Sequence, residues 1–118
     1  MKRDPRAFLS DVIEAGQAIH QAIAGISLDE YDNSRLIRSS VEREFITIGE
    51  ALMQLSQRDQ ALFGEIEQAP QIISFRNKLT HDYININNQL VWGVIKSNLP
   101  TLVDQCRQLL DRLDRELP

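Results

Sequence analysis

Apolar residues recur at intervals of three and four along nearly the whole chain, the spacing that places side chains on one face of an α-helix. Asp4 is expected to cap the first helix, Pro5 fits its first position, and Gly25 is expected to end it. Residues 27–31 are expected to form a short turn, with room for one helical turn. The apolar stripe of this first helix comprises Leu9, Val12, Gly16, Ile19, Ile23 and Ile26.

A second helix is expected to begin after a cap at Asn33 or Ser34 and to close near residues 56–59. Its apolar stripe comprises Ile37, Val41, Phe45, Ile48, Leu52 and Leu55. Asp59 is suited to cap a short third helix. A fourth helix is expected to begin near Pro70 and to fade around residues 84–88, with Ile72, Phe75 and Leu79 inside.

The last apolar stripe runs from Val91 to Leu117 and continues across a proline. Asn87 or Asn88 is expected to cap it, and Pro100 predicts two helices that meet at a kink or tight turn near residues 98–100. Sustained alternation of apolar and polar residues is not found in any segment. The sequence therefore predicts an all-α fold in a single domain over residues 1–118. The expected architecture is an antiparallel bundle of about four main helices plus short helices.

Charge and composition narrow the function. The chain holds 13 Lys and Arg against 17 Asp and Glu, a net charge of -4, which excludes a protein that coats nucleic acid by bulk charge. Any RNA contact then needs a local basic patch. The single cysteine, Cys106, excludes an internal disulfide and a cysteine-rich zinc site, and it is expected to be a small buried hydrophobe. The apolar runs are too short for a signal peptide or a membrane span, so we expect a cytoplasmic protein.

Chemically useful side chains concentrate between residues 76 and 83, where Arg, Asn, Lys, His, Asp and Tyr fall within eight positions. On one helix Arg76 and His81 point ~140° apart, so they cannot reach one atom. Asn77 and His81 share a face. Convergence of Arg76 and His81 needs either unwinding near His81 or a second copy of the helix across a two-fold axis. This geometry predicts a two-fold homodimer with a cleft at its interface.

The same window also has a structural interpretation as a simple helix end. Arg76 would then pair with a carboxylate, Lys78 with Asp82, and His81 would interact with the helix dipole. A metal site is not expected, because the adjacent His81 and Asp82 diverge on a helix.

Four other candidates lie outside the window. His20 is expected to be a packing residue at the rim of the core. Three glutamates are expected on the solvent side of the second helix: Glu42, Glu44 and Glu50. Arg38 and Glu42, four positions apart, are expected to form an ion pair, and the alternative for Glu50 is a functional role.

The spacing R-x-x-x-x-H-x-Y, filled by Arg76, His81 and Tyr83, resembles the signature of the HEPN superfamily. More narrowly, the chain resembles the HepT-type toxins of prokaryotic HEPN/MNT toxin–antitoxin pairs. The polar residue that family members carry after the arginine is Asn77 here. Further similarity lies in Ile48-Gly49-Glu50-Ala51, in residues 72–77, in Val91-Trp92 and in Leu99-Pro100.

The resemblance implies a helical dimer that is a metal-independent endoribonuclease without a cofactor of its own. His81 would move the proton of the RNA 2′-OH or of the leaving 5′-oxygen, because an imidazole can both accept and donate a proton near neutral pH. Arg76 would neutralise charge on the phosphate, and Asn77 would orient the histidine or the phosphate. The expected product is a 2′,3′-cyclic phosphate. Lys78, Arg38 and Arg43, with the neighbouring Arg35, are the expected RNA contacts.

The resemblance also implies control of the type VII kind. The cognate antitoxin would be an MNT-type nucleotidyltransferase that uses ATP and a divalent metal to attach AMP to Tyr83, which places charge and bulk beside His81. Two alternatives remain at this point. The chain could be a non-catalytic helical subunit that binds nucleotide or the nucleotidyltransferase partner, or a purely structural bundle.

Overall fold

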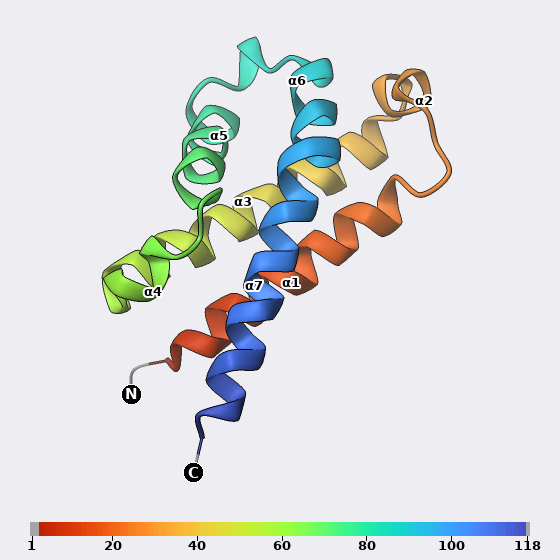
Figure 1. Ribbon diagram of the computed structural model, residues 1–118. Coiled ribbons are helices and arrows are strands. Elements are labelled where there is room, and N and C mark those ends of the chain that lie inside the picture. Colours follow the sequence, from red (N-terminus) through yellow and green to blue (C-terminus); the bar gives the residue numbers. More distant parts are fainter. Residues whose placement is uncertain (1–2, 118) are drawn as a thin grey trace.

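A computed structural model describes residues 3–117, and the regular elements in this range are all helical (Figure 1). The predicted all-α class is confirmed. The α-helices are α1 (Pro5–Ala22), α2 (Leu28–Asn33), α3 (Arg35–Arg58), α4 (Gln60–Gly64), α5 (Ala69–His81), α6 (Asn88–Gly93) and α7 (Leu99–Arg115). Two further pieces are the 3₁₀-helix η1 (Tyr83–Asn85) and the π-helix η2 (Val94–Asn98). None of the helices within residues 3–117 has the length and apolarity that a membrane crossing requires.

One hydrophobic core joins the long helices. Helix α1 packs against both α3 and α7 (Figure 1). Helix α5 packs against α3, whereas α7 packs against α1. Between α3 and α5 the rings of Phe45 and Phe75 meet edge to face, with centroids 5.0 Å apart. Burial of the predicted stripes drives this packing: Leu9, Ile19, Phe45, Ile48, Leu52 and Leu99 are among the side chains without solvent exposure.

The predicted helix starts are confirmed. The Asp4 carboxylate accepts the backbone N–H of Arg6 at 2.9 Å, and the side-chain oxygens of Ser34, Asp59 and Asn87 cap α3, α4 and α6. The predicted end of the first helix is three residues too late. Helix α1 ends at Ala22, and Gly25 instead supplies a positive φ of 76° in the turn that follows.

The two helices predicted to meet near Pro100 are present, but no tight turn separates them. Helix α6 continues through η2 into α7 as one rod (Figure 1). The backbone N–H of Leu99 donates to the carbonyl of Val94, five residues back, which is a π-type bond. This wider turn accommodates the proline: Pro100 has no N–H to donate, and its ring sits in the first turn of α7, where the missing bond costs little.

The fourth predicted helix also ends earlier than expected. Helix α5 stops at His81, because Asp82 adopts φ -135° and ψ 45°, and the chain then turns through η1. The Asp82 carboxylate accepts from the Asn85 amide at 2.7 Å, a local bond that competes with continuation of the helix.

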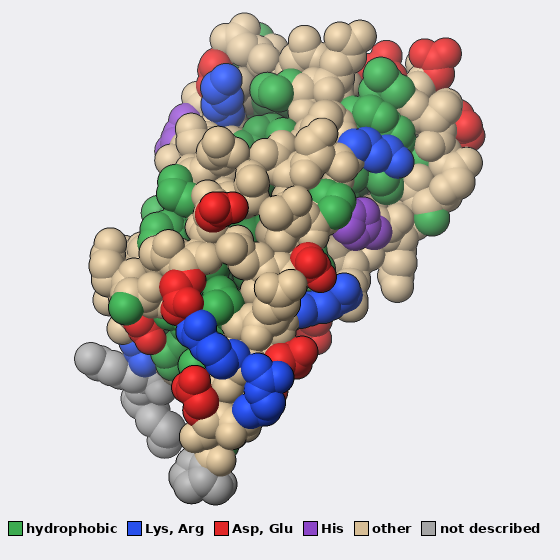
Figure 2. All heavy atoms as spheres, in the orientation of Figure 1, with side chains coloured by type: hydrophobic (Ala, Val, Ile, Leu, Met, Phe, Trp, Pro, Cys, Tyr) green, Lys and Arg blue, Asp and Glu red, His purple; other side chains and the backbone are tan. Residues whose placement is uncertain are grey.

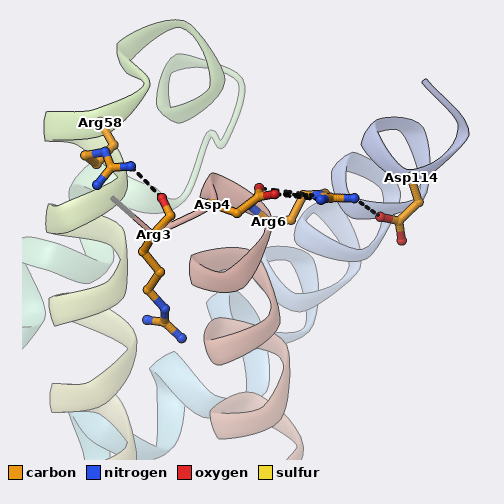
Figure 3. A network of polar contacts seen from close by, with 5 residues as sticks. All are labelled: Arg3, Asp4, Arg6, Arg58 and Asp114. Atoms are coloured by element: carbon orange, nitrogen blue, oxygen red, sulfur yellow. Dashed lines mark hydrogen bonds and ion pairs between the residues drawn. The ribbon is translucent and has the colours of Figure 1, made fainter. Parts of the chain in front are cut away.

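Polar contacts join the start of α1 to the ends of two other helices (Figure 3). Arg6 forms ion pairs with Asp4 at 2.6 Å and with Asp114 of α7 at 3.2 Å. The guanidinium of Arg58, the last residue of α3, donates to the carbonyl of Arg3 at 2.5 Å. These contacts lie near both termini, at the end of the molecule away from η1 (Figure 1).

Candidate functional site

Arg76 occupies the contact between α5 and α3. Its side chain is only 15% exposed, and its Nη2 forms an ion pair with Oε1 of Glu50 on α3. Its Nη1 donates to Oδ1 of Asn77 at 2.9 Å. Among the described residues its buried Nε has no hydrogen-bond partner. The guanidinium is therefore fixed by one neighbour on its own helix and one on another.

Gly49 makes this position available. A methyl group built on Gly49 would lie 2.5 Å from Cβ and 3.1 Å from Cδ of Arg76, closer than carbon atoms pack. The stem of Arg76 thus lies directly across the glycine. Three consecutive residues of α3 thus have different roles. Ile48 is buried in the core, Gly49 lies under the stem of Arg76, and Glu50 pairs with its guanidinium.

His81 is the last residue of α5 and is exposed. It lies in the last turn with Lys78, where positive charge interacts favourably with the helix dipole. The helix remains regular up to His81, so Arg76 and His81 still diverge by ~140° and are offset by about 7.5 Å along the axis. Unwinding near His81, one of the two predicted routes to convergence, begins only at Asp82 and leaves the directions of Arg76 and His81 unchanged. The Oδ1 of Asn77 accepts from Arg76, and no bond from Asn77 to His81 occurs within residues 3–117.

Tyr83 opens the 3₁₀ turn that follows α5. Its side chain is 66% exposed, and the next residue, Ile84, is 94% exposed. An accessible phenol therefore lies two residues from His81, beside an uncovered apolar side chain.

Two grooves lie on the helices that carry this contact, and Glu50 lines the second of them. One, of about 230 Å³, lies between α5 and the rod of α6 and η2, and Lys78 and Leu90 are among its lining residues. The other, of about 380 Å³, lies between α1 and α3, and Arg43 and Glu50 are among its lining residues. Among residues 3–117 no three His, Cys, Asp or Glu side chains gather as a metal site would require.

Comparison with known proteins decides the family. Residues 12–109 match the HepT-like family, described as ribonuclease HepT-like. This chain belongs to the HepT-like family. The putative RNase MJ1380 of Methanocaldococcus jannaschii is 30% identical over 101 residues, which cover 86% of this chain and 92% of that protein. No solved structure matches the chain significantly.

Two further relatives extend over nearly the whole length. The putative RNase TTE0752 of Caldanaerobacter subterraneus subsp. tengcongensis is 23% identical over 110 residues, 93% of this chain and 97% of its own. The probable ribonuclease HepT of Thermococcus cleftensis is 26% identical over 109 residues, 92% of this chain and 98% of its own. The family resemblance inferred from the motif is confirmed.

The basic residues predicted to contact RNA lie in separate places on this HepT-like chain. Lys78 lines the groove beside α6, Arg43 lines the groove beside α1, and the Arg38 guanidinium donates to the carbonyl of Asp32. On the face in Figure 2 the Lys and Arg side chains are interspersed with acidic ones. Their role in RNA binding stays a prediction.

The contribution of α3 to the position of Arg76 was larger than the sequence pattern indicates. Glu50 was expected on the solvent side, and its side chain is indeed 47% exposed, but it is also the carboxylate that pairs with Arg76. The close approach at Gly49 was not foreseen. The available signal was a glycine beside Ile48, in the middle of an otherwise strong helix pattern. Glycine lowers the stability of a helix interior, so its presence there indicates a close packing contact.

The structural interpretation of the window is confirmed in part on the HepT-like chain. Arg76 does pair with a carboxylate, and His81 does lie in the last turn of α5. The expected pair of Lys78 and Asp82 is not among the ion pairs of residues 3–117, where Asp82 binds Asn85 instead. The pair of Arg38 and Glu42 is likewise not formed in this range; burial raises the pKa of Glu42, although Arg38 opposes the shift.

Proposed function

We propose that this chain is an endoribonuclease toxin of a HEPN/MNT toxin–antitoxin pair, which cleaves RNA without a metal at the interface of a two-fold homodimer. The observation that carries the proposal is the R-x-x-x-x-H-x-Y window in a HepT-like chain, with Arg76 fixed in place and His81 exposed at a helix end. The regular helix up to His81 supports the dimer, since a second protomer is then the remaining way to bring the two side chains together.

In the proposed reaction the 2′-oxygen of the RNA attacks the adjacent phosphorus and the bond to the 5′-oxygen breaks. His81 accepts the 2′-OH proton or donates a proton to the leaving 5′-oxygen, which leaves a 2′,3′-cyclic phosphate and a 5′-OH. Arg76 stabilises the charge that builds on the non-bridging oxygens, and Asn77 orients its guanidinium. DNA has no 2′-OH and cannot react in this way.

Mixed dimers provide the sharpest test of this proposal. Arg76→Ala and His81→Ala homodimers should both be inactive on RNA and should keep the wild-type fold by circular dichroism. A refolded equal mixture should recover about a quarter of wild-type activity, because half of randomly paired dimers are mixed and each has one complete site. A mixture that remains inactive while mixed dimers form would place both side chains in one protomer and would refute the shared site. Activity of the His81→Ala homodimer equal to wild type would remove the acid–base role.

For regulation we propose that the partner nucleotidyltransferase modifies Tyr83. The phenol oxygen would attack the α-phosphorus of ATP, forming an O–P bond as pyrophosphate leaves and the phenol loses its proton. The added phosphodiester carries negative charge, which opposes RNA phosphate. Exposure of Tyr83 supports this role. Intact mass after incubation with partner and ATP should rise by AMP, and Tyr83→Phe should abolish the increase; an undiminished increase would place the modification elsewhere.

A second candidate is a non-catalytic subunit that binds the nucleotidyltransferase. The exposed pair Tyr83 and Ile84 favours it, because an uncovered apolar surface suits a partner as well as a substrate site. This candidate predicts a tight complex and no RNA cleavage at any concentration of the chain. Cleavage that disappears with His81→Ala would decide against it.

A further inference from the structure

The guanidinium of Arg76 is oriented before any substrate is present. It extends from α5 across Gly49 and ends against the carboxylate of Glu50, which belongs to α3. An arginine side chain has four rotatable torsions, and an isolated one would sample many orientations. Here the packing of the stem across Gly49 and the charged hydrogen bond to Glu50 at its tip, both provided by α3, restrict those orientations.

We infer that Glu50 is the positioning residue of the site: its carboxylate holds the Arg76 guanidinium in the orientation that receives the phosphodiester, and lowers the affinity for that phosphate in return. The inference rests on the proposed function, since it assigns the phosphate of RNA to Arg76. Glu50 acts through Arg76 and has no reacting atom of its own.

The positioning half of the inference follows from the donor pattern of Arg76. Nη2 is committed to Glu50 and Nη1 to Asn77, while Nε is buried. The N–H bonds that remain for a phosphate are the second ones on Nη1 and Nη2. Because both nitrogens are held by known partners, the direction of those remaining bonds is set. Loss of Glu50 leaves only Asn77 on the same helix to orient the group.

The affinity half follows from charge. Glu50 is nearly half exposed, so its negative charge faces the same solvent from which a phosphate approaches Arg76. A carboxylate in an ion pair with a guanidinium neutralises much of its charge and repels a second anion. Removal of the charge with retention of the hydrogen bond should therefore tighten RNA binding. A purely structural ion pair would not produce this separation of binding and turnover.

Three variants separate the two effects. Glu50→Ala removes hydrogen bond and charge, whereas Glu50→Gln keeps an oxygen that accepts from the guanidinium and removes only the charge. Glu44→Gln is the matched control: it makes the same change on the same helix, with its side chain about 120° away around the axis. Glu44 lines a different groove, with Asp11 and Glu14 of α1.

Steady-state cleavage of a short fluorescent RNA by the full-length chain gives the first readout. Glu50→Ala should lower kcat by about tenfold, because the guanidinium loses its fixed geometry. Glu50→Gln should restore kcat to within about threefold of wild type and lower KM by about threefold, the effect expected of one screened charge. Binding of the same RNA in the inactive His81→Ala background should show the same tightening. Glu44→Gln should change neither constant.

Nuclear magnetic resonance of the Arg76 side chain gives a second readout that needs no activity. Rotation about the bonds between Cζ and the guanidinium nitrogens should be slow in the wild type and fast in Glu50→Ala. The backbone spectra of the two proteins should be the same. Equal rotation in the two proteins would overturn the inference, and so would kcat and KM values that are the same in wild type, Glu50→Gln and Glu50→Ala. If the rotation depends on Glu50 but the wild type cleaves no RNA, the proposed ribonuclease function fails while the restraint on Arg76 stands.

Discussion

The contact between Gly49 and Arg76 makes a stability prediction that can be worked out from the structure. In Gly49→Ala the new methyl would lie 2.5 Å from Cβ of Arg76. That atom is fixed to the backbone of α5 and cannot rotate away, so α3 and α5 must separate. Overpacking of this kind costs up to about 3 kcal/mol, and alanine regains about 1 kcal/mol of helix propensity. We expect Gly49→Ala to lower the free energy of unfolding by about 2 kcal/mol.

Urea denaturation followed by far-UV circular dichroism and by Trp92 fluorescence measures this difference. Gly93→Ala is the control, because Gly93 has helical torsion angles of φ -61° and ψ -42° and its added methyl meets nothing within 4 Å. It should gain up to about 1 kcal/mol. Runs at several chain concentrations separate unfolding from any dissociation.

A double-mutant cycle locates the cause. In an Arg76→Gly background the overlapping carbons are absent, so Gly49→Ala should change from destabilising to stabilising by about 1 kcal/mol. A Gly49→Ala protein as stable as wild type, with the same dependence on urea, would show that α3 and α5 do not approach this closely. An unchanged penalty in the Arg76→Gly background would assign it to a different neighbour.

The titrating groups give three smaller predictions. Burial raises the pKa of Cys106 to about 12, so the folded chain should resist a thiol reagent at pH 8 and react once unfolded, and its stability relative to Cys106→Ala should fall as pH rises above about 9. Partial burial, and then the charges of Lys96 and Arg107, lower the pKa of His20. As the pH falls, His20 therefore binds a proton in the unfolded chain before it does so in the folded chain. The melting temperature of wild type relative to His20→Gln should then drop below pH 6.5. Burial raises the pKa of Glu42, so the stability that its protonated form provides is lost as pH rises, and Glu42→Gln should melt higher than wild type at pH 7 but not at pH 4.

The periodic features of the chain were predictable, because one long helix buries one stripe. The stripe through Val41, Phe45 and Ile48 is buried as expected, and Cys106 lies in the core. Side chains that cap helices were also predictable, since Asp4 and Asn87 act on N–H groups two residues away. In both cases the interaction depends on neighbours within a few positions of the sequence.

The errors have a common origin in contacts between distant segments or in rare backbone geometry. Pro100 was expected to interrupt the last helix, but one π turn just before it preserves the rod. Arg76 and Glu50 are 26 positions apart, and the pattern of α3 alone places Glu50 toward solvent. Only the packing of α5 across Gly49 brings the two together. Arg76, His81 and Tyr83 therefore stay predicted site residues, while the contribution of Glu50 to the orientation of Arg76 was underestimated.

The two ends of the motif differ in a way that bears on how the site would work. Arg76 is packed and paired, whereas His81 and Tyr83 are exposed at the helix end and in the turn beyond it. A charge-stabilising group benefits from rigidity, because its donors must already point at the phosphate when charge develops. A group that exchanges protons with substrate, and a phenol that a second enzyme must reach, benefit from access. We therefore expect activity to depend on α3 through Arg76, and control to act at the exposed end of α5 without disturbing that packed contact.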